Sequence, residues 1–250
     1  MRKLFTFALL LALFSISGTQ LYAQNLSALD ILKKADAVVN APKDMHQFSR
    51  MILIDKDGDE KVRESEMYQL GAEKRLVRFL SPADQKGIGF LTLPGDMMYL
   101  YLPAFHKIRR IASHVKNENF AGTDFSYDDM SSFKYAEEYD PKLLETKEDV
   151  YVLELTPKPN VEKEYSKLIM TIRKDNFYPI TFEYYDKAGH LWKVMERRKL
   201  QKKGNYWIPM EMEMKDLKKQ HTTKMITDKV ELDSGLTDKT FTKRNLQKVK

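Results

Sequence analysis

The sequence predicts a mainly β protein, an antiparallel meander of ten or more strands that closes into a barrel or half-barrel. Three observations predict it. Short apolar segments recur between residues 48 and 232, separated by turn residues. Several of these segments alternate apolar and polar side chains, as strands with one buried face do. Almost no helical periodicity intervenes, so the connections suit antiparallel neighbours.

The first 23 residues are typical of a secretory signal peptide. Arg2 and Lys3 precede an uncharged apolar run at residues 4–16, and Ala23 supplies the small residue expected before the cleavage site. A buried N-terminal helix is the alternative, but it does not explain this order, and the run is too short for a membrane span. We therefore expect export, cleavage after Ala23, and a single β-barrel domain over residues 24–250.

The net charge and the composition of the chain limit the classes of partner that it can bind. The formal net charge of +6 falls to +4 once the two basic signal residues are removed. This modest surplus suits contact with anionic lipid headgroups and predicts no nucleic-acid partner. The chain contains no cysteine, so we expect neither disulfides nor acylation of an N-terminal cysteine. No later apolar run approaches about 20 residues, and we expect a soluble mature chain.

One helix is expected at the start of the mature chain. Ser27 can cap its N-terminus, apolar residues follow at helical spacing from Leu29 to Val39, and Pro42 ends it. The apolar stripe is narrow, so we expect the helix to lie across one opening of the sheet.

Eleven segments are expected to be strands, because they alternate or are rich in β-branched and aromatic residues and are bounded by turn residues. They are residues 48–55, 60–70, 74–80, 88–93, 97–102, 150–156, 167–173, 180–186, 191–200, 206–215 and 222–232. Along the tenth, Ile208, Met210, Met212 and Met214 alternate with Pro209, Glu211, Glu213 and Lys215. Alternation predicts one apolar and one solvated face. The thirteen methionines suit ordinary core packing or an adaptable cavity.

Residues 112–139 break the strand rhythm. A long irregular segment inside a compact domain is usually functional or disordered. Aromatic anchors such as Phe120, Phe125 and Tyr127 argue against disorder. We expect a loop with short helical turns that packs into the mouth of the barrel.

The motifs of catalysis and metal binding are missing from the sequence. It has no Gly-x-Ser-x-Gly nucleophile elbow, and its five histidines are scattered singly. Residues 87–89 lack the third glycine of a phosphate loop. Residues 55–66 imitate a calcium loop but place Glu60 where the turn requires glycine, and a hairpin explains them better. Adjacent acidic pairs, 128–129 and 137–138, point to opposite faces of an extended chain. We expect no enzyme activity, no metal and no cofactor.

Four stretches carry a family resemblance: ILIDKDGDEKVRESEMYQLG, KRLVRFLSPADQKGIGFLTLP, MMYLYLPAFHKIRRIASHVKNENFAGTDFSYDDM and DKTFTKRNL. They resemble the outer-membrane lipoprotein-sorting protein-like family, periplasmic proteins related in fold to LolA and LolB. The resemblance implies an incomplete antiparallel β-barrel, plugged by short helices, whose concave apolar face holds lipid or lipoprotein acyl chains. It also implies association with exporters of the RND type, and it brings no catalytic motif.

A carrier of this kind has to hide acyl chains from water, and each buried CH₂ contributes about 0.8 kcal/mol. The residues expected to line its cavity are Phe90, Tyr99, Tyr101, Leu168, Met170, Met210, Met212 and Met214. Three basic residues, Lys107, Arg109 and Arg110, are expected to meet lipid headgroups or a membrane partner, with an ordinary solvated strand as the alternative.

The leading hypothesis is a periplasmic carrier for outer-membrane lipoprotein sorting or lipid transport, with a lipoprotein-release or RND-type transporter as partner. A non-catalytic accessory protein of an RND-type exporter is the second hypothesis. A hydrolase of envelope lipid is the third.

Overall fold

The computed structural model describes residues 26–131 and 133–248, so the predicted signal sequence lies outside the described residues. The strands are β1 (Asp44–Ile54), β2 (Glu60–Leu70), β3 (Lys74–Ser81), β4 (Gly89–Leu93), β5 (Met97–Leu102), β6 (Lys107–Arg110), β7 (Tyr139–Thr146), β8 (Val150–Pro157), β9 (Lys167–Arg173), β10 (Pro179–Tyr185), β11 (Leu191–Lys203), β12 (Tyr206–Asp216) and β13 (His221–Leu232). The helices are α1 (Ala28–Val39), α2 (Tyr135–Glu138) and α3 (Lys243–Leu246).

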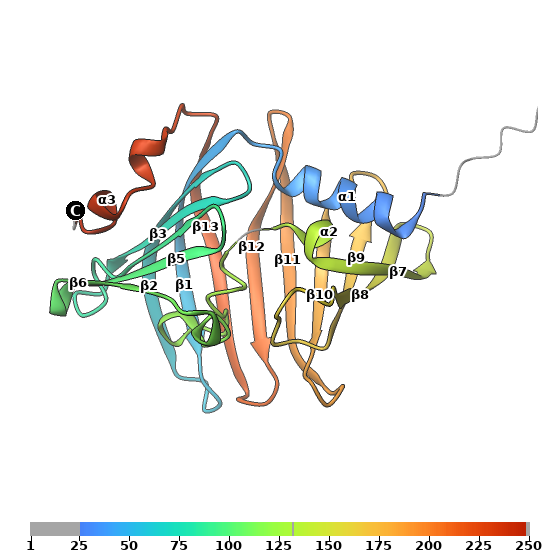
Figure 1. Ribbon diagram of the computed structural model, residues 1–250, viewed down its shortest axis with the longest axis horizontal. Helices are drawn as coiled ribbons and strands as arrows, with labels where there is room; N and C mark the ends of the chain where they lie inside the picture. The colour runs from blue at the N-terminus through green and yellow to red at the C-terminus, as the bar shows by residue number, and fades with distance from the viewer. Residues whose placement is uncertain (1–25, 132, 249–250) are drawn as a thin grey trace, which may run out of the picture.

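All thirteen strands belong to one antiparallel sheet, in the order β6-β5-β4-β3-β2-β1-β13-β12-β11-β10-β9-β8-β7. The first strand pairs with the last, with Met51 opposite Met225, so two meanders are joined side by side. The sheet curves without closing, and its edges are β6 and β7 (Figure 1). The predicted antiparallel half-barrel with few short helices is therefore confirmed.

The eleven expected strands are all present, together with two more, of which the first had been only the alternative interpretation of the basic residues and the second was missed. These are the edge strands β6 and β7. The basic β6 has only four residues, and β7 contains Pro141 and no regular alternation. Proline is tolerated on an edge strand because its missing N–H faces no neighbour.

The helix α1 forms as predicted. The Ser27 hydroxyl accepts a hydrogen bond from the N–H of Asp30 at 3.1 Å, which caps the first turn. Its buried residues are Ile31, Leu32 and Ala35, on one narrow stripe. This stripe rests on α2, β7 and β12, so the helix lies over one end of the sheet (Figure 1).

The core has two parts, on opposite faces of the sheet. The larger lies on the concave face, beneath α1 and residues 111–138. The smaller lies on the convex face of β2 to β5, where Phe241 and Leu246 of the C-terminal segment cover Leu76 and Leu91. The expectation of one solvated face per strand was therefore wrong for β3 and β4, which are buried on both faces.

The face of β12 that was expected to be solvated is also partly buried. The side chain of Glu213 is buried, and its carboxylate lies 3.1 Å from Arg198 Nη2 and 3.1 Å from Lys215 Nζ. Basic side chains from neighbouring positions thus cover the acid and shield it from water.

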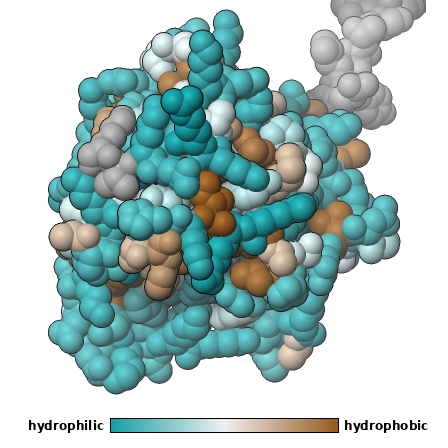
Figure 2. Space-filling model, turned by 60° about the vertical axis from the view of Figure 1, so that its left-hand side comes forward, coloured by the Kyte–Doolittle hydropathy of each residue, from teal (hydrophilic) through white to brown (hydrophobic). Residues whose placement is uncertain are grey.

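None of the helices within residues 26–131 and 133–248 is long and apolar enough to cross a membrane. Seen from the side where β6 and α3 lie, the surface is mostly hydrophilic, with hydrophobic side chains gathered near its centre (Figure 2).

Candidate functional site

The connection between the two edge strands crosses the concave face of the sheet. We call this connection, residues 111–138, the plug. It contains short helical turns at Ser113–Val115, Phe120–Gly122 and α2, as the sequence predicted. The Phe120 side chain is fully buried, with its ring centroid 5.5 Å from that of Phe79 and 5.5 Å from that of Phe90. The plug is therefore an integral part of the core.

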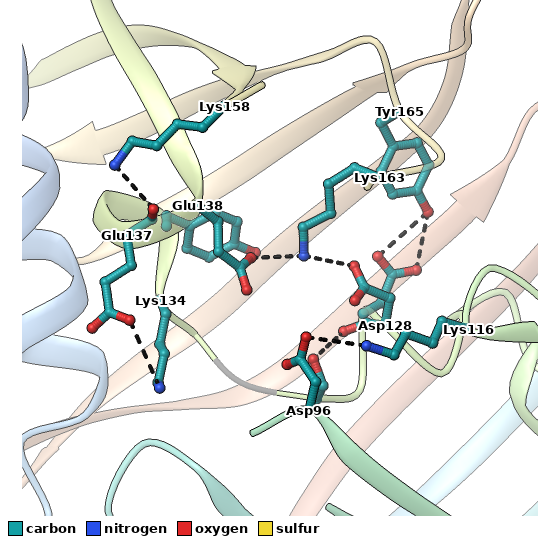
Figure 3. Close-up of polar contacts among 12 residues, drawn as sticks. Asp96, Lys116, Asp128, Lys134, Glu137, Glu138, Lys158, Lys163 and Tyr165 are labelled. Carbon is teal, nitrogen blue, oxygen red and sulfur yellow. Dashed lines mark hydrogen bonds and ion pairs between the residues drawn. The ribbon is translucent and has the colours of Figure 1, made fainter. Parts of the chain in front are cut away.

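Ion pairs fasten the second half of the plug to the loop between β8 and β9. The Nζ atom of Lys163 lies 2.9 Å from Asp128 Oδ2 and 2.7 Å from Glu138 Oε2, between the two carboxylates (Figure 3). Lys158 donates to the carbonyl oxygens of Ala136 and Glu137 at 3.0 and 2.9 Å. Burial raises the pKa of Glu138, which Lys163 opposes. This network holds the plug against the sheet at one border.

A cavity of about 120 Å³ lies between the plug and the concave face. Its walls come from the end of α1, from strands β1, β2 and β3, from the strands β10 to β13, and from the plug. Six of the thirteen methionines line it: Met45, Met67, Met130, Met195, Met212 and Met225. Flexible thioether side chains can adapt their shape to a variable apolar ligand.

The predicted lining residues fall into three groups. Met212 lines the cavity. Phe90, Leu168, Met170 and Met214 are fully buried in the larger core, and Met210 is half-buried outside the cavity lining. Tyr99 and Tyr101 lie on the convex face in the smaller core.

The placement of Tyr99 and Tyr101 on the convex face corrects their assignment to a concave cavity. Their neighbour Met98 is buried in the larger core, on the concave face. Both faces of β5 are covered by protein, so alternation alone does not identify the inner one. The basic residues Lys107, Arg109 and Arg110 lie on the edge strand β6, and all three are exposed.

Two charged residues that the sequence interpretation missed also line the cavity. Arg75 on β3 is 3% exposed and Arg197 on β11 is 5% exposed. Their guanidinium carbons lie 4.5 and 4.7 Å from the centroid of the Phe133 ring. Burial, together with the charge of Arg197, lowers the pKa of Arg75 to about 10.

The alternation of apolar and polar residues along β3 and β11 could have identified both arginines. Arg75 shares the strand face of Val77 and Phe79, and Arg197 shares that of Met195, so each occupies a position where an apolar residue is expected. A cationic side chain on a buried strand face is rare enough to indicate a functional site.

One acidic residue lines the same cavity. The carboxylate of Asp129 accepts hydrogen bonds from the N–H of Ser126 at 2.8 Å and from the hydroxyl of Tyr165 at 3.0 Å. Burial raises the pKa of Asp129 above its ordinary value, although Lys193 opposes the rise. No group of three or more His, Cys, Asp or Glu side chains in the described part of the chain is placed to hold a metal ion.

The contact between α1 and the plug is expected to depend on pH. Asp36 accepts hydrogen bonds from the N–H of Ala136 at 2.8 Å and of Tyr135 at 3.3 Å. Burial nevertheless raises the pKa of Asp36 from 3.8 to about 6. Between pH 3.8 and about pH 6, the Asp36 carboxyl group therefore binds a proton in the folded state but has largely lost it in the unfolded chain. Stability from this group is therefore complete below pH 4 and is lost as the pH rises through about 6.

We expect Asp36→Asn to remove this dependence. From pH 4 to pH 7 the wild-type protein should lose about 2 kcal/mol of unfolding free energy relative to the variant. Urea denaturation of both proteins at the two pH values measures the difference. Parallel pH profiles for the two proteins would contradict the prediction.

Comparisons with known proteins agree on the fold. A family model of uncharacterized proteins matches residues 71–248, more than half of the chain. A solved domain named for outer membrane lipoprotein sorting, from Vibrio parahaemolyticus, is 28% identical, covers 88% of this chain and 98% of its own, and has a TM-score of 0.82. A DUF1329 family protein from Desulfovibrio piger gives the same four values.

A LolA superfamily protein from Nitrosomonas europaea has the same fold, with 24% identity, a TM-score of 0.73, and coverage of 88% of this chain and 99% of its own. No curated protein matches the chain.

Proposed function

This chain belongs to the outer-membrane lipoprotein-sorting protein-like family, and from that premise we propose that it is a periplasmic, non-catalytic carrier of lipid or lipoprotein acyl chains. The observation that carries the proposal is the methionine-lined cavity between the concave face and the plug. An apolar cavity on this face is where a carrier would shield an acyl chain from water. The name of the Vibrio parahaemolyticus relative and the expected signal sequence support the same compartment and role.

The size of the cavity bears on how cargo would enter. Its volume of about 120 Å³ is below the roughly 300–1,000 Å³ of sites that enclose drug-sized ligands. An acyl chain therefore fits only if the cavity widens. The strands that line the cavity are bonded through their backbones to a neighbour on both sides, whereas the plug is held largely by side chains such as Phe120 and Lys163. We infer that cargo enters by displacing the plug.

The proposal predicts that Met212→Gln weakens binding of a fluorescent fatty-acyl probe and leaves the fold intact. Replacing the thioether by an amide removes apolar surface that would contact the acyl chain and places a polar group there, at a cost of about 1–3 kcal/mol, which corresponds to a Kd raised roughly 5- to 150-fold. Fluorescence titration measures the affinity, and thermal unfolding followed by circular dichroism checks the fold.

Met210→Gln is the matched control. It makes the same chemical change two residues earlier on β12, at a half-buried position outside the cavity lining. Its probe affinity should stay within about twofold of wild type. A wild-type protein that binds no acyl probe, together with strong unfolding of Met212→Gln, would show that this face is only packed core and end the carrier proposal.

A further inference from the structure

Three arginines are buried in the part of the chain that the structure describes, and they differ in how their charge is compensated. Arg78 lies with its Nη1 atom 2.6 Å from Glu66 Oε1, and both side chains are 2% exposed. Arg75 and Arg197 have no carboxylate within 4 Å among residues 26–131 and 133–248. Burying a charge is costly unless it is paired, so two unpaired guanidinium groups in one place require an explanation.

The guanidinium group of Arg75 retains a donor that protein atoms do not use, and that of Arg197 is held mainly against aromatic rings. Arg75 donates to Gln69 Oε1 at 3.2 Å and to the Ser131 carbonyl, but its Nη2 atom is buried without a hydrogen-bond partner. Arg197 donates a long hydrogen bond, 3.5 Å to the carbonyl of Pro179, and its guanidinium carbon also lies 5.6 and 4.8 Å from the ring centroids of Tyr178 and Phe182. Both residues line the cavity and lie over the Phe133 ring. The unpartnered donor of Arg75 therefore remains for a ligand to satisfy when the cavity widens, next to the charge of Arg197.

We propose that Arg75 and Arg197 form an anion-binding end of the cavity, so that the carrier selects amphiphiles with a carboxylate or phosphate group next to the acyl chain. This inference rests on the proposed function and names its ligand class. The guanidinium fork matches the geometry of both anions, and each pairing would supply the missing counter-charge. Asp129, the acidic residue of the lining, forms no ion pair with either arginine among the described residues; its carboxylate accepts hydrogen bonds from Ser126 and Tyr165 instead.

The sheet register provides an apolar path that leads away from the arginines. Arg197 is paired directly with Met212, which is paired with Met225 on the next strand. Arg75 is paired with Gln69, which is paired with Met45. Neighbouring strands are about 4.8 Å apart. The row from Arg197 therefore extends toward the centre of the sheet over two methionines, and the row from Arg75 reaches Met45 after Gln69. An anionic head at the arginines would place its chain along these rows.

A competition experiment with matched chains tests the proposal. The purified protein is loaded with a neutral pyrene-labelled long-chain alcohol, which is then displaced at pH 8 with dodecanoic acid, dodecanol, dodecyl phosphate or inorganic phosphate. We expect the acid and the phosphate ester to bind at least about tenfold more tightly than dodecanol. In Arg75→Met and Arg197→Met this preference should be lost, while the affinity for dodecanol stays within about twofold. Arg50→Met, which removes an exposed arginine paired with Asp228, should keep it.

Each other outcome has a distinct meaning. Equal affinity of wild type for dodecanoic acid and dodecanol would overturn the anion site and leave the carrier function standing. Failure of every chain to bind would overturn the carrier function itself. Inorganic phosphate that displaces the probe as well as dodecyl phosphate does would identify a free-anion site and overturn the amphiphile. If a methionine variant does not fold, the wild-type comparison and Arg197→Lys, which keeps the charge and should keep the preference, still decide.

Discussion

Arg78→Met is expected to lower the free energy of unfolding by about 3–5 kcal/mol, because it leaves the Glu66 carboxylate buried without its guanidinium. The two side chains meet at 2.6 Å and are shielded from water by the C-terminal segment. Arg78 Nη2 also donates to the carbonyl oxygen of Asn245 at 2.7 Å, so the substitution loosens that segment as well. Urea denaturation of the purified variant measures the loss.

Arg50→Met is the control for Arg78→Met. Arg50 pairs with Asp228 at 2.9 Å, but both side chains are exposed, so its loss should change the stability far less than the loss of Arg78 does. The double variant Glu66→Gln/Arg78→Met should recover part of the stability, because no charge then remains buried at this position. A single Arg78→Met protein as stable as the Arg50→Met control would contradict the prediction.

Phe120→Ala is expected to cost about 3–5 kcal/mol of unfolding free energy and to speed release of a bound acyl probe. Its fully buried ring joins the plug to Phe79 on β3 and Phe90 on β4. Truncation leaves a cavity where these rings meet, and the plug then opens more readily. Chemical denaturation gives the stability, and stopped-flow dilution of the loaded protein gives the release rate.

Phe105→Ala is the matched control for Phe120→Ala, because Phe105 is 63% exposed. It should change neither the stability nor the release rate by a measurable amount. Release from Phe120→Ala at the wild-type rate, in a protein that is nevertheless destabilised, would show that cargo does not leave by way of the plug.

The fold was largely predictable because strands with one buried face can be recognised by the alternation of apolar and polar residues along them. β12 and β9 carry apolar residues at every second position, and the Asp57-Gly58 turn fixes the first hairpin. The edge strands β6 and β7 were not among the eleven expected strands, for a physical reason. Each has a single neighbour to pair with, so neither needs the apolar, β-branched residues that identify a central strand.

The site was less predictable, because alternation separates two faces without saying which is concave. Tyr99 and Tyr101 are buried as an apolar face should be, but Phe241 and Leu246 cover them from outside. That cover depends on the C-terminal segment, which lies more than a hundred residues away in the sequence. The arginines at positions 75 and 197 were recognisable as charges on apolar faces. Their meeting across Phe133 needed the tertiary structure.

The order of the strands gives the plug a mechanical role. It is the only covalent connection between the meander that ends at β6 and the meander that begins at β7, and these two strands are the opposite edges of the curved sheet. The plug therefore crosses the open side of the curved sheet from one edge to the other. Flattening the sheet would move its edges apart and lengthen the distance that the plug spans, whereas increasing the curvature would shorten it. The curvature of the sheet and the distance that the plug has to span over the cavity are therefore geometrically linked.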